Sequence, residues 1–159
     1  MSEGELREKG PDRLGEWLAG MWADYRASIV AAGYTEEAAD ANVARNRAAL
    51  TRGDGLAPGN HVFDVLADGR AVGVVWIGRP SGDGDAGGEY YVYDVVVAEA
   101  ERGRGYGRLA MELVEAWVRA AGGTRVGLNV WGNNAVARSL YSSLGYRELA
   151  VSMAKDLGD

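Results

Sequence analysis

The feature of this chain that most restricts its fold is an apolar strand leading directly into a turn rich in glycine and arginine. The strand ends in Val95, Val96 and Val97, and glycines at positions 103, 105 and 107 precede an amphipathic helix. Glycines allow a tight backbone turn, and the first amides of a helix have no partner inside it. These amides and the helix dipole favour an anion in front of the helix. The order of strand, turn and helix therefore predicts a phosphate-binding site.

Three arginines strengthen this prediction, because Arg102, Arg104 and Arg108 place full positive charges around the turn. A ligand that carries a diphosphate is the natural occupant of such a site. The glycine spacing differs from the dinucleotide pattern G-x-G-x-x-G, and the absence of a following G-K-[ST] excludes a Walker loop. A tight turn that binds nothing is the alternative, but the arginines would then repel one another without any gain.

Composition limits the class of protein. A chain of 159 residues with 47% hydrophobic content is expected to form one domain over residues 1–159, whose first ten residues are poorly ordered or a weak edge strand. The net charge of -6 argues against nucleic-acid binding and favours cationic partners. With no cysteine and one histidine, we expect neither thiolate chemistry nor a metal site. No apolar run approaches the roughly 20 residues of a membrane span and no secretory pattern is visible, so we expect a cytoplasmic protein without a membrane partner.

Hydrophobic periodicity predicts alternating helices and strands. The predicted helices cover residues 11–33, 35–50, 106–121 and 134–144, and the predicted strands cover 5–8, 61–67, 70–77, 89–97, 124–130 and 146–153. Asp68-Gly69 is a strong signal for an antiparallel hairpin, whereas the strand, helix and strand over 89–130 imply a parallel crossover. The expected fold class is therefore α+β with a mixed sheet, with loops over 52–60 and 78–88.

A second motif lies one strand downstream of the glycine turn. It consists of Leu128, Val130, Asn134, Ala137, Leu140, Tyr141, Gly145 and Tyr146. Taken alone, these residues are consistent with core contacts of a short helix, with Asn134 as an ordinary N-cap. Together with Arg102-x-x-Gly105-x-Gly107, in this order and at this separation, they closely resemble the GNAT superfamily of acyl-CoA-dependent N-acetyltransferases. The helices over 12–50, the segment 58–61 and Tyr93-Asp94 are similar to a little-characterised bacterial subgroup.

The resemblance implies a mixed sheet whose strands 89–97 and 124–130 splay apart at a bulge, flanked by about four helices. It implies that acetyl-CoA, the acyl donor, binds with its diphosphate on the amides of residues 103–108. The backbone of Val95 and Val97 then serves the pantetheine arm and the thioester carbonyl, and Asn134 holds a pantetheine amide. The residues assigned to the cofactor in this way are Val95, Val96, Val97, Arg102, Gly103, Arg104, Gly105, Tyr106, Gly107, Arg108, Asn134, Ala137 and Tyr141.

Tyr141 matches the general acid of the family, which protonates the departing CoA thiolate. A tyrosine with a pKa of ~10 stays protonated at neutral pH and is acidic enough to serve a thiolate of pKa near 8.5. Packing against CoA, or a hydrogen bond to its sulfur, is the alternative role for Tyr141.

The sequence leaves several candidates for the general base. An alkylamine with a pKa near 10.4 is neutral in only about one molecule in 10³ at pH 7, so a base helps. Some family members carry a glutamate where this chain has Tyr91 or Asn129. Glu89 lies on the same strand face as Tyr91, Asp94 is expected on the opposite face, and His61 has a suitable intrinsic pKa. Relay through water is a fourth possibility.

The resemblance places the acceptor amine near the two N-terminal helices and the loops 52–60 and 78–88. The candidate acceptor-binding residues are Trp22, Tyr25, Tyr91, Asn129 and Trp131, although most aromatic residues of such a chain belong to its core. Loop 78–88, with Asp83 and Asp85, is an acidic lip or a solvated loop. We expect acetyl transfer to a small-molecule or peptide amine by direct attack in a ternary complex, and a homodimer. A non-catalytic acyl-CoA sensor or assembly module, and a nucleotide- or sugar-phosphate-binding domain, are the competing hypotheses.

Overall fold

The computed structural model describes residues 3–80 and 88–158 and divides the chain into two compact units, Met1–Asn129 and Val130–Asp159. Each unit is described by itself. The acidic residues Asp83 and Asp85 of the predicted loop 78–88 lie outside the described residues.

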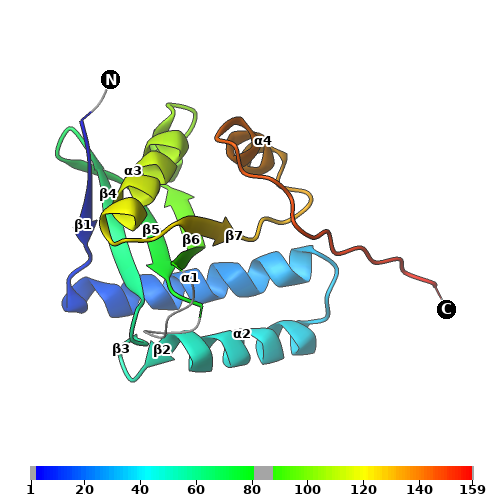
Figure 1. Cartoon of the computed structure of the whole chain (residues 1–159). Helices are drawn as coiled ribbons and strands as arrows, with labels where there is room; N and C mark the ends of the chain where they lie inside the picture. Colours follow the sequence, from blue (N-terminus) through cyan, green and yellow to red (C-terminus); the bar gives the residue numbers. More distant parts are fainter. Residues whose placement is uncertain (1–2, 81–87, 159) are drawn as a thin grey trace. The chain divides into compact units, whose positions relative to one another are not determined.

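A five-stranded sheet organises the first unit, in the order β1-β4-β5-β6-β7 (Figure 1). Its strands are β1 (Gly4–Glu8), β4 (His61–Ala67), β5 (Arg70–Gly78), β6 (Glu89–Val97) and β7 (Arg125–Leu128). Neighbouring strands from β1 to β6 are antiparallel, and β7 pairs with β6 in parallel. The mixed sheet confirms the predicted fold class, and the first residues of the chain supply its edge strand.

The turn between β4 and β5 shows how local chemistry sets the sheet. Asp68 and Gly69 have φ angles of 50° and 77°, the left-handed conformation that a two-residue hairpin turn requires at both positions. The turn is also tied to the edge of the sheet, because the amide of Glu3 donates to Asp68 Oδ1 at 3.0 Å. The sequence Asp-Gly thus produces the predicted hairpin.

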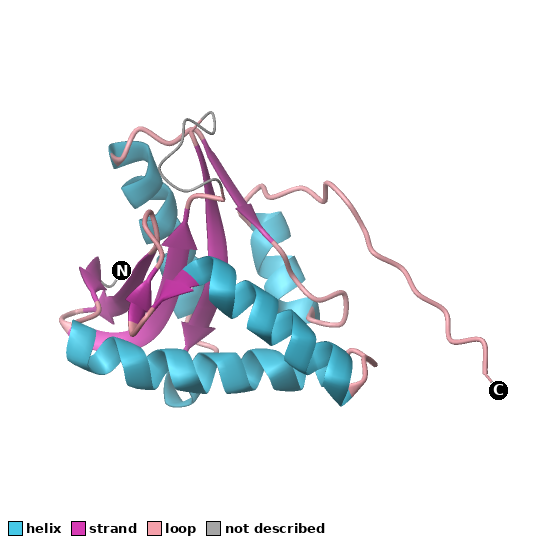
Figure 2. Cartoon of the chain, turned by 90° about the horizontal axis from the view of Figure 1, so that it is seen from below, coloured by secondary structure: helices cyan, strands magenta, loops and turns pink. Residues whose placement is uncertain are grey.

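Helices cover both faces of the sheet. Helix α1 (Pro11–Ala31) packs Leu18 and Trp22 against Val62 and Trp76, and runs beside α2 (Glu36–Leu50), on the side from which Figure 2 is viewed. Successive strand residues point to opposite faces, so Phe63 faces the other way, where it meets Trp117 of α3 (Tyr106–Ala120) at 5.4 Å between ring centres. The core therefore forms two layers, one on each side of β4, β5 and β6.

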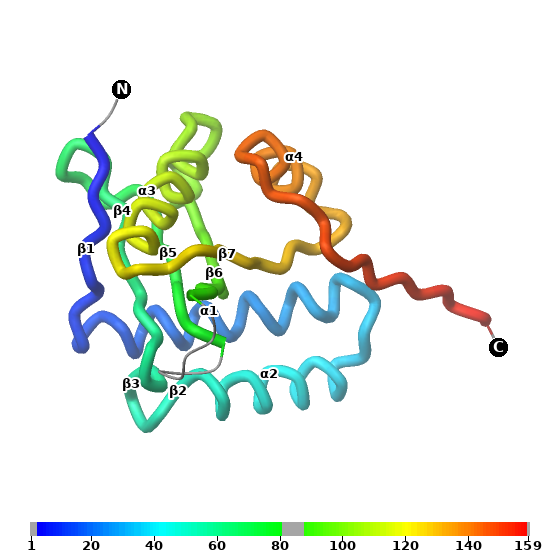
Figure 3. The backbone as a smooth tube through the Cα atoms, viewed as in Figure 1, coloured from blue at the N-terminus to red at the C-terminus, as the bar shows by residue number. Residues whose placement is uncertain are grey.

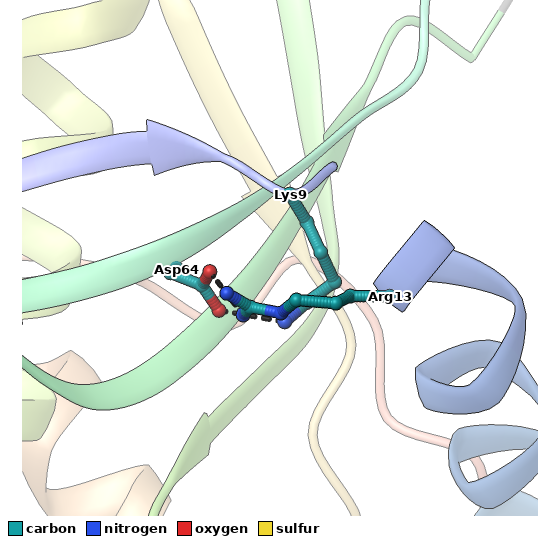
Figure 4. Close-up of polar contacts among 3 residues, drawn as sticks. All are labelled: Lys9, Arg13 and Asp64. Carbon is teal, nitrogen blue, oxygen red and sulfur yellow. Dashed lines mark hydrogen bonds and ion pairs between the residues drawn. The ribbon is translucent and has the colours of Figure 1, made fainter. Parts of the chain in front are cut away.

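A buried ion cluster fixes the start of α1. The carboxylate of Asp64 on β4 accepts hydrogen bonds from Lys9 Nζ and Arg13 Nη2, both at 2.6 Å (Figure 4). Lys9 and Asp64 are buried, whereas Arg13 is largely exposed. Lys9 follows β1 and Arg13 lies in the first turn of α1, so one carboxylate anchors both to the sheet.

The structure corrects three predictions of secondary structure. The predicted loop 52–60 contains part of a small two-stranded ladder, β2 (Thr51–Arg52) with β3 (Gly55–Leu56), and β7 ends at Leu128 rather than at residue 130. The predicted strand over 146–153 is wrong, since none of the described residues there is in a strand. The alternating residues Leu149, Val151 and Met153 favour an extended chain, but a strand also needs a paired neighbour, and these side chains are exposed.

The second unit contains α4 (Ala135–Ser143), close to the predicted bounds, followed by an extended segment that Figure 3 traces to the C-terminus in red. Asn134 caps the helix, because its Oδ1 accepts a hydrogen bond from the amide of Ala137 at 3.1 Å. Gly145, with φ of 91°, ends it.

Candidate functional site

The glycine turn joins β6 to α3 through a short helical turn, η1 (Glu99–Glu101). Gly103 and Gly105 have φ angles of 75° and 84°, and a Cβ atom added at either would meet no atom of the described residues within 4 Å. Backbone conformation rather than crowding therefore requires glycine here. The first bond inside α3 runs from the amide of Leu109 to the carbonyl of Gly105 at 3.1 Å. The amides of Tyr106 and Gly107 consequently have no partner within the helix and are available to an anion.

A carboxylate from the turn is held by two arginines. Glu101 forms an ion pair with Arg70, the first residue of β5, and a second with Arg104 at 3.4 Å. The hydrogen bond from Arg70 lowers the pKa of Glu101 below its usual value, so this side chain is ionised. Sequence reasoning missed Arg70 and Glu101, because they are 31 residues apart and no local pattern links them.

Arg102 is turned toward the preceding strand, since its Nε donates to the carbonyl oxygen of Val97 at 3.2 Å. The glycine turn is therefore fastened at two points, to β6 through Arg102 and to β5 through Arg70. Counting Arg70, Arg104 and Glu101 together, the cluster carries a net positive charge beside the start of α3.

The end of β6 has an open edge in the described part of the first unit. Pairing between β6 and β7 runs from Glu89 opposite Arg125 to Val92 opposite Leu128 and ends there. The amide of Ala98 donates to Val72 of β5, so alternation turns the backbone groups of Val95 and Val97 toward the β7 side. The two strands thus separate beyond Val92, at the level of the valines.

The bulge that was expected between strands 89–97 and 124–130 lies instead between β5 and β6. The register shifts between Trp76 and Ile77: Trp76 lies opposite Asp94, whereas Ile77 lies opposite Val92. Tyr93 is therefore the extra residue, unmatched in the β5 ladder. The position of the bulge is a property of β5 and β6 together, so the sequence of β6 alone does not reveal it.

The bulge also corrects the expected face of Asp94. Residues opposite each other in an antiparallel ladder share a face, and Asp94 lies opposite Trp76, which packs on Trp22 of α1. Tyr91 lies opposite Gly78, two residues from Trp76, and so faces the same way. Asp94 and Tyr91 thus share the α1 side of the sheet, whereas strict alternation predicted opposite sides.

Burial shapes the protonation of this face. Burial raises the pKa of Asp94 to about 6, with a further contribution from the charge of Asp24 on α1, while a hydrogen bond from the Val95 backbone opposes the rise. Burial likewise raises the pKa of Tyr91 to about 12, helped by Tyr93 and Tyr25. At neutral pH the tyrosines are neutral, and Asp94 is mostly ionised with an appreciable affinity for a proton.

The three candidate bases do not lie together. Glu89 forms an ion pair with Arg125 at 3.7 Å, at the start of β6. With a rise of about 3.3 Å per residue, Glu89 lies roughly 20 Å along the strand from Val95. His61 stacks on Phe63 at 5.8 Å, with its Nδ1 3.4 Å from Glu8, on the face opposite Asp94. Of the three, Asp94 alone is adjacent to the open edge of β6.

The candidate acceptor-binding residues separate into two groups. Trp22 is a buried core residue, in contact with the rings of Tyr25 at 6.1 Å and Trp76 at 5.9 Å. Tyr25 is partly exposed and donates a hydrogen bond to Asn42 Oδ1 of α2 at 2.9 Å. With Tyr91, these residues line the α1 side of the sheet in the first unit.

The remaining acceptor candidates, Asn129 and Trp131, follow β7, with Asn129 ending the first unit and Trp131 belonging to the second. The second unit also carries the predicted acid. Tyr141 lies on α4 with its ring 5.8 Å from that of Tyr146, whose amide donates to the Tyr141 carbonyl at 3.0 Å. Asn134 and Ala137 form the cap described above.

No group of at least three metal-binding side chains occurs in the part of the chain that the structure describes. Within residues 3–80 and 88–158, the structure contains no helix with both the length and the apolar character needed to cross a membrane.

The order of β6, the glycine turn, α3 and the short helix α4 is the pattern on which the resemblance to acyl-CoA-dependent N-acetyltransferases is based. The model of the Acetyltransferase (GNAT) family matches residues 19–146. This chain belongs to that family, and the resemblance seen in its sequence is confirmed.

Two named relatives come from Bacillus subtilis. The uncharacterized N-acetyltransferase YycN is 31% identical over 101 residues, 63% of this chain and 64% of the relative. The uncharacterized N-acetyltransferase YdgE is 28% identical over 98 residues, 62% of each chain. The chain thus matches less than two thirds of the length of these curated relatives.

Two solved structures share the fold over 99% of this chain. The crystal structure of YycN has a TM-score of 0.86 and 27% identity, covering 99% of this chain and all (100%) of that one. The protein AAC(6')-Iy, solved with the bisubstrate analog CoA-S-monomethyl-acetylneamine, has a TM-score of 0.56 and 16% identity, covering 99% and 100% of the chains. The second likeness shows the fold alone.

Proposed function

We propose that this chain is an N-acetyltransferase that transfers the acetyl group of acetyl-CoA to a primary amine by direct attack in a ternary complex. The observation that carries this proposal is the glycine turn, whose unpartnered helix amides lie next to the open edge of β6. Family membership and the CoA-bound aminoglycoside N-acetyltransferase among the structural neighbours support it. Because the family model spans both compact units, we also propose that they form one acetyltransferase domain.

The amides of residues 103–108 and the side chains of Arg102, Arg104 and Arg108 are the proposed partners of the diphosphate. The fit rests on the two left-handed glycines, which leave open space where side chains would project. The pantetheine arm is then proposed to run along Val95, Val96 and Val97, at the edge toward which the backbone groups of Val95 and Val97 point. Asn134 is proposed to hold a pantetheine amide through its side-chain nitrogen, since its oxygen caps α4.

The reaction requires one base and one acid. The amine nitrogen attacks the thioester carbonyl carbon, the developing oxyanion is stabilised by a backbone amide at the open edge, and the carbon–sulfur bond breaks. We assign Asp94 as the base that takes the amine proton, because it lies next to Val95 and has a pKa of about 6. Tyr141 is the proposed acid that protonates the CoA thiolate.

A thiol-release assay tests this function. Purified protein is mixed with acetyl-CoA and a panel of primary amines, and free CoA thiol is followed while mass spectrometry detects the acetylated amine. Stoichiometric thiol and acetyl-amine for at least one acceptor is the expected result. Acetyl-CoA binding without thiol release for any amine would instead favour a non-catalytic sensor. The observation that favours a sensor is that Tyr91 and Asn129 stand where some family members carry a glutamate. Tighter binding of ATP than of acetyl-CoA would favour a nucleotide-binding domain.

The acceptor is proposed to be a small molecule or a peptide amine held on the α1 side of the sheet. The partly exposed rings of Tyr25 and Tyr91 provide an apolar surface there, and the ionised Asp94 attracts a protonated amine. A homodimer and a cytoplasmic location remain predictions from family resemblance and composition.

A further inference from the structure

One arginine outside the glycine turn contacts both ends of it. Arg70 begins β5, directly after the hairpin turn, and its guanidinium pairs with Glu101 before the turn. The phenol of Tyr106, the first residue of α3, is close enough to this guanidinium to contribute, after Glu101, to the raised pKa of Arg70. The side chain of Arg70 is 56% exposed, whereas that of Glu101 is only 13% exposed.

The carboxylate of Glu101 is shared unequally between its two arginines. Arg70 binds Oε1 closely, while Arg104 approaches Oε2 at 3.4 Å, near the outer limit of a hydrogen bond. Glu101 is an anion a few residues from amides arranged to receive another anion. If Arg70 were absent, Arg104 would be the cation that remains on that carboxylate among the described residues, and their pairing would cancel the charge of Arg104 beside α3.

We propose that Arg70 is a positioning residue for the binding of the acetyl-CoA diphosphate. Arg70 does not contact the diphosphate itself; it neutralises Glu101 and so leaves Arg104 available to the phosphates. This inference rests on the proposed function, since it assumes that the glycine turn binds acetyl-CoA. It assigns a role to the hairpin turn between β4 and β5, which lies far from the glycine turn in sequence.

A double-mutant cycle separates this role from two others. If Arg70 contacted phosphate directly, Arg70→Ala would weaken binding whether or not Glu101 were present. If the bridge were only a mechanical brace, Glu101→Ala would weaken binding as much as Arg70→Ala. If Arg70 acts by neutralising Glu101, removal of Glu101 makes Arg70 dispensable.

The experiment measures the dissociation constant of acetyl-CoA by titration calorimetry for the wild type, R70A, E101A and R70A/E101A. We expect R70A to bind about tenfold more weakly, and E101A and the double variant to bind within about threefold of the wild type. The loss in R70A should shrink in high salt, because the arginines of the cluster are exposed. Arg7→Ala, which removes an exposed arginine paired with Glu5 on β1, is the matched control and should bind normally.

Each other outcome counts against the inference. Equal losses in R70A and E101A, a loss that persists in the double variant, or unchanged binding in R70A would overturn it. A wild type that does not bind acetyl-CoA would remove the proposed function as well, so the two failures are distinguishable. Circular dichroism verifies that each variant is folded, and Arg70→Gln, which keeps hydrogen bonding without charge, replaces R70A in the cycle if R70A does not fold.

Discussion

Replacing Asp94 by asparagine should lower activity and raise stability at the same time. The pKa of Asp94 rises from 3.8 to about 6 on folding, chiefly through burial. At about 1.4 kcal/mol per pH unit, ionised Asp94 costs the folded state roughly 3 kcal/mol at pH 7. Asparagine is nearly the same size and its Oδ1 can still accept the Val95 hydrogen bond, but it carries no charge. We therefore expect Asp94→Asn to unfold with a free energy up to about 3 kcal/mol higher at pH 7.

The sign of this effect depends on pH. The native state binds the proton of Asp94 more tightly than the unfolded state, so wild-type stability falls as pH rises from about 4 to about 6. Below about pH 4 the carboxyl is protonated in both states, and the advantage of the variant should vanish. Activity has the opposite dependence, because the base must be ionised: kcat at saturating amine should rise with pH up to about 6 and then level.

Urea unfolding at pH 4 and pH 7 measures the stability, and thiol release with a working acceptor measures the rate. Loss of the base should lower kcat by roughly 10²-fold or more. Glu89→Gln is the matched control, a carboxylate of the same strand held in an ion pair with Arg125. If Asp94→Asn kept full activity, or if Glu89→Gln lost it instead, Asp94 would not be the base. A destabilised Asp94→Asn at pH 7 would refute the electrostatic reasoning itself.

Three further perturbations test other parts of the molecule. Tyr141→Phe should lower kcat at least about tenfold while acetyl-CoA binds normally, and an unchanged kcat would remove Tyr141 as the acid. Gly105→Ala should weaken acetyl-CoA binding and cost about 1–2 kcal/mol of stability, because its φ of 84° is unfavourable for a side chain; calorimetry and thermal unfolding measure both. Lys9→Met leaves the buried Asp64 with Arg13 alone and should destabilise the fold by about 1.5–3 kcal/mol in urea unfolding, whereas the exposed Arg7→Met should change stability little.

Features that depend on neighbours in sequence were predictable. The hairpin at Asp68-Gly69, the glycine turn and the start of the helix predicted over 35–50 each follow from residues that act locally. At that helix start, Thr35 Oγ1 accepts a hydrogen bond from the amide of Ala38 at 3.1 Å. The α+β fold class followed from their order along the chain. Local chemistry is enough in these cases, because the interactions close within a few residues.

Features that depend on distant partners were not predictable in the same way. The pairing of Arg70 with Glu101 joins a hairpin to a helix start, and nothing in either segment identifies the other. The face of Asp94 was mispredicted because alternation assumes a regular ladder, whereas the register shift at Trp76 is a property of two strands together. The segment 146–153 shows the same limit, since alternation predicts a strand but not the partner that would pair with it.

The bulge in β6 accounts for why a base and an open backbone edge occur side by side. Without the bulge at Tyr93, regular alternation from Tyr91 would place Asp94 on the α3 face, away from Tyr91 and Tyr25. With it, Asp94 turns to the α1 face, and pairing with β7 has already ended at Val92, so the backbone groups of Val95 and Val97 point to an open edge. The bulge therefore places a carboxylate that accepts protons on the proposed acceptor side. The amide of Val95 donates to this carboxylate, and the amide of Val97 is the nearby group that a thioester carbonyl can reach. A strand without the bulge would keep the same side chains but separate the proposed base from the acceptor.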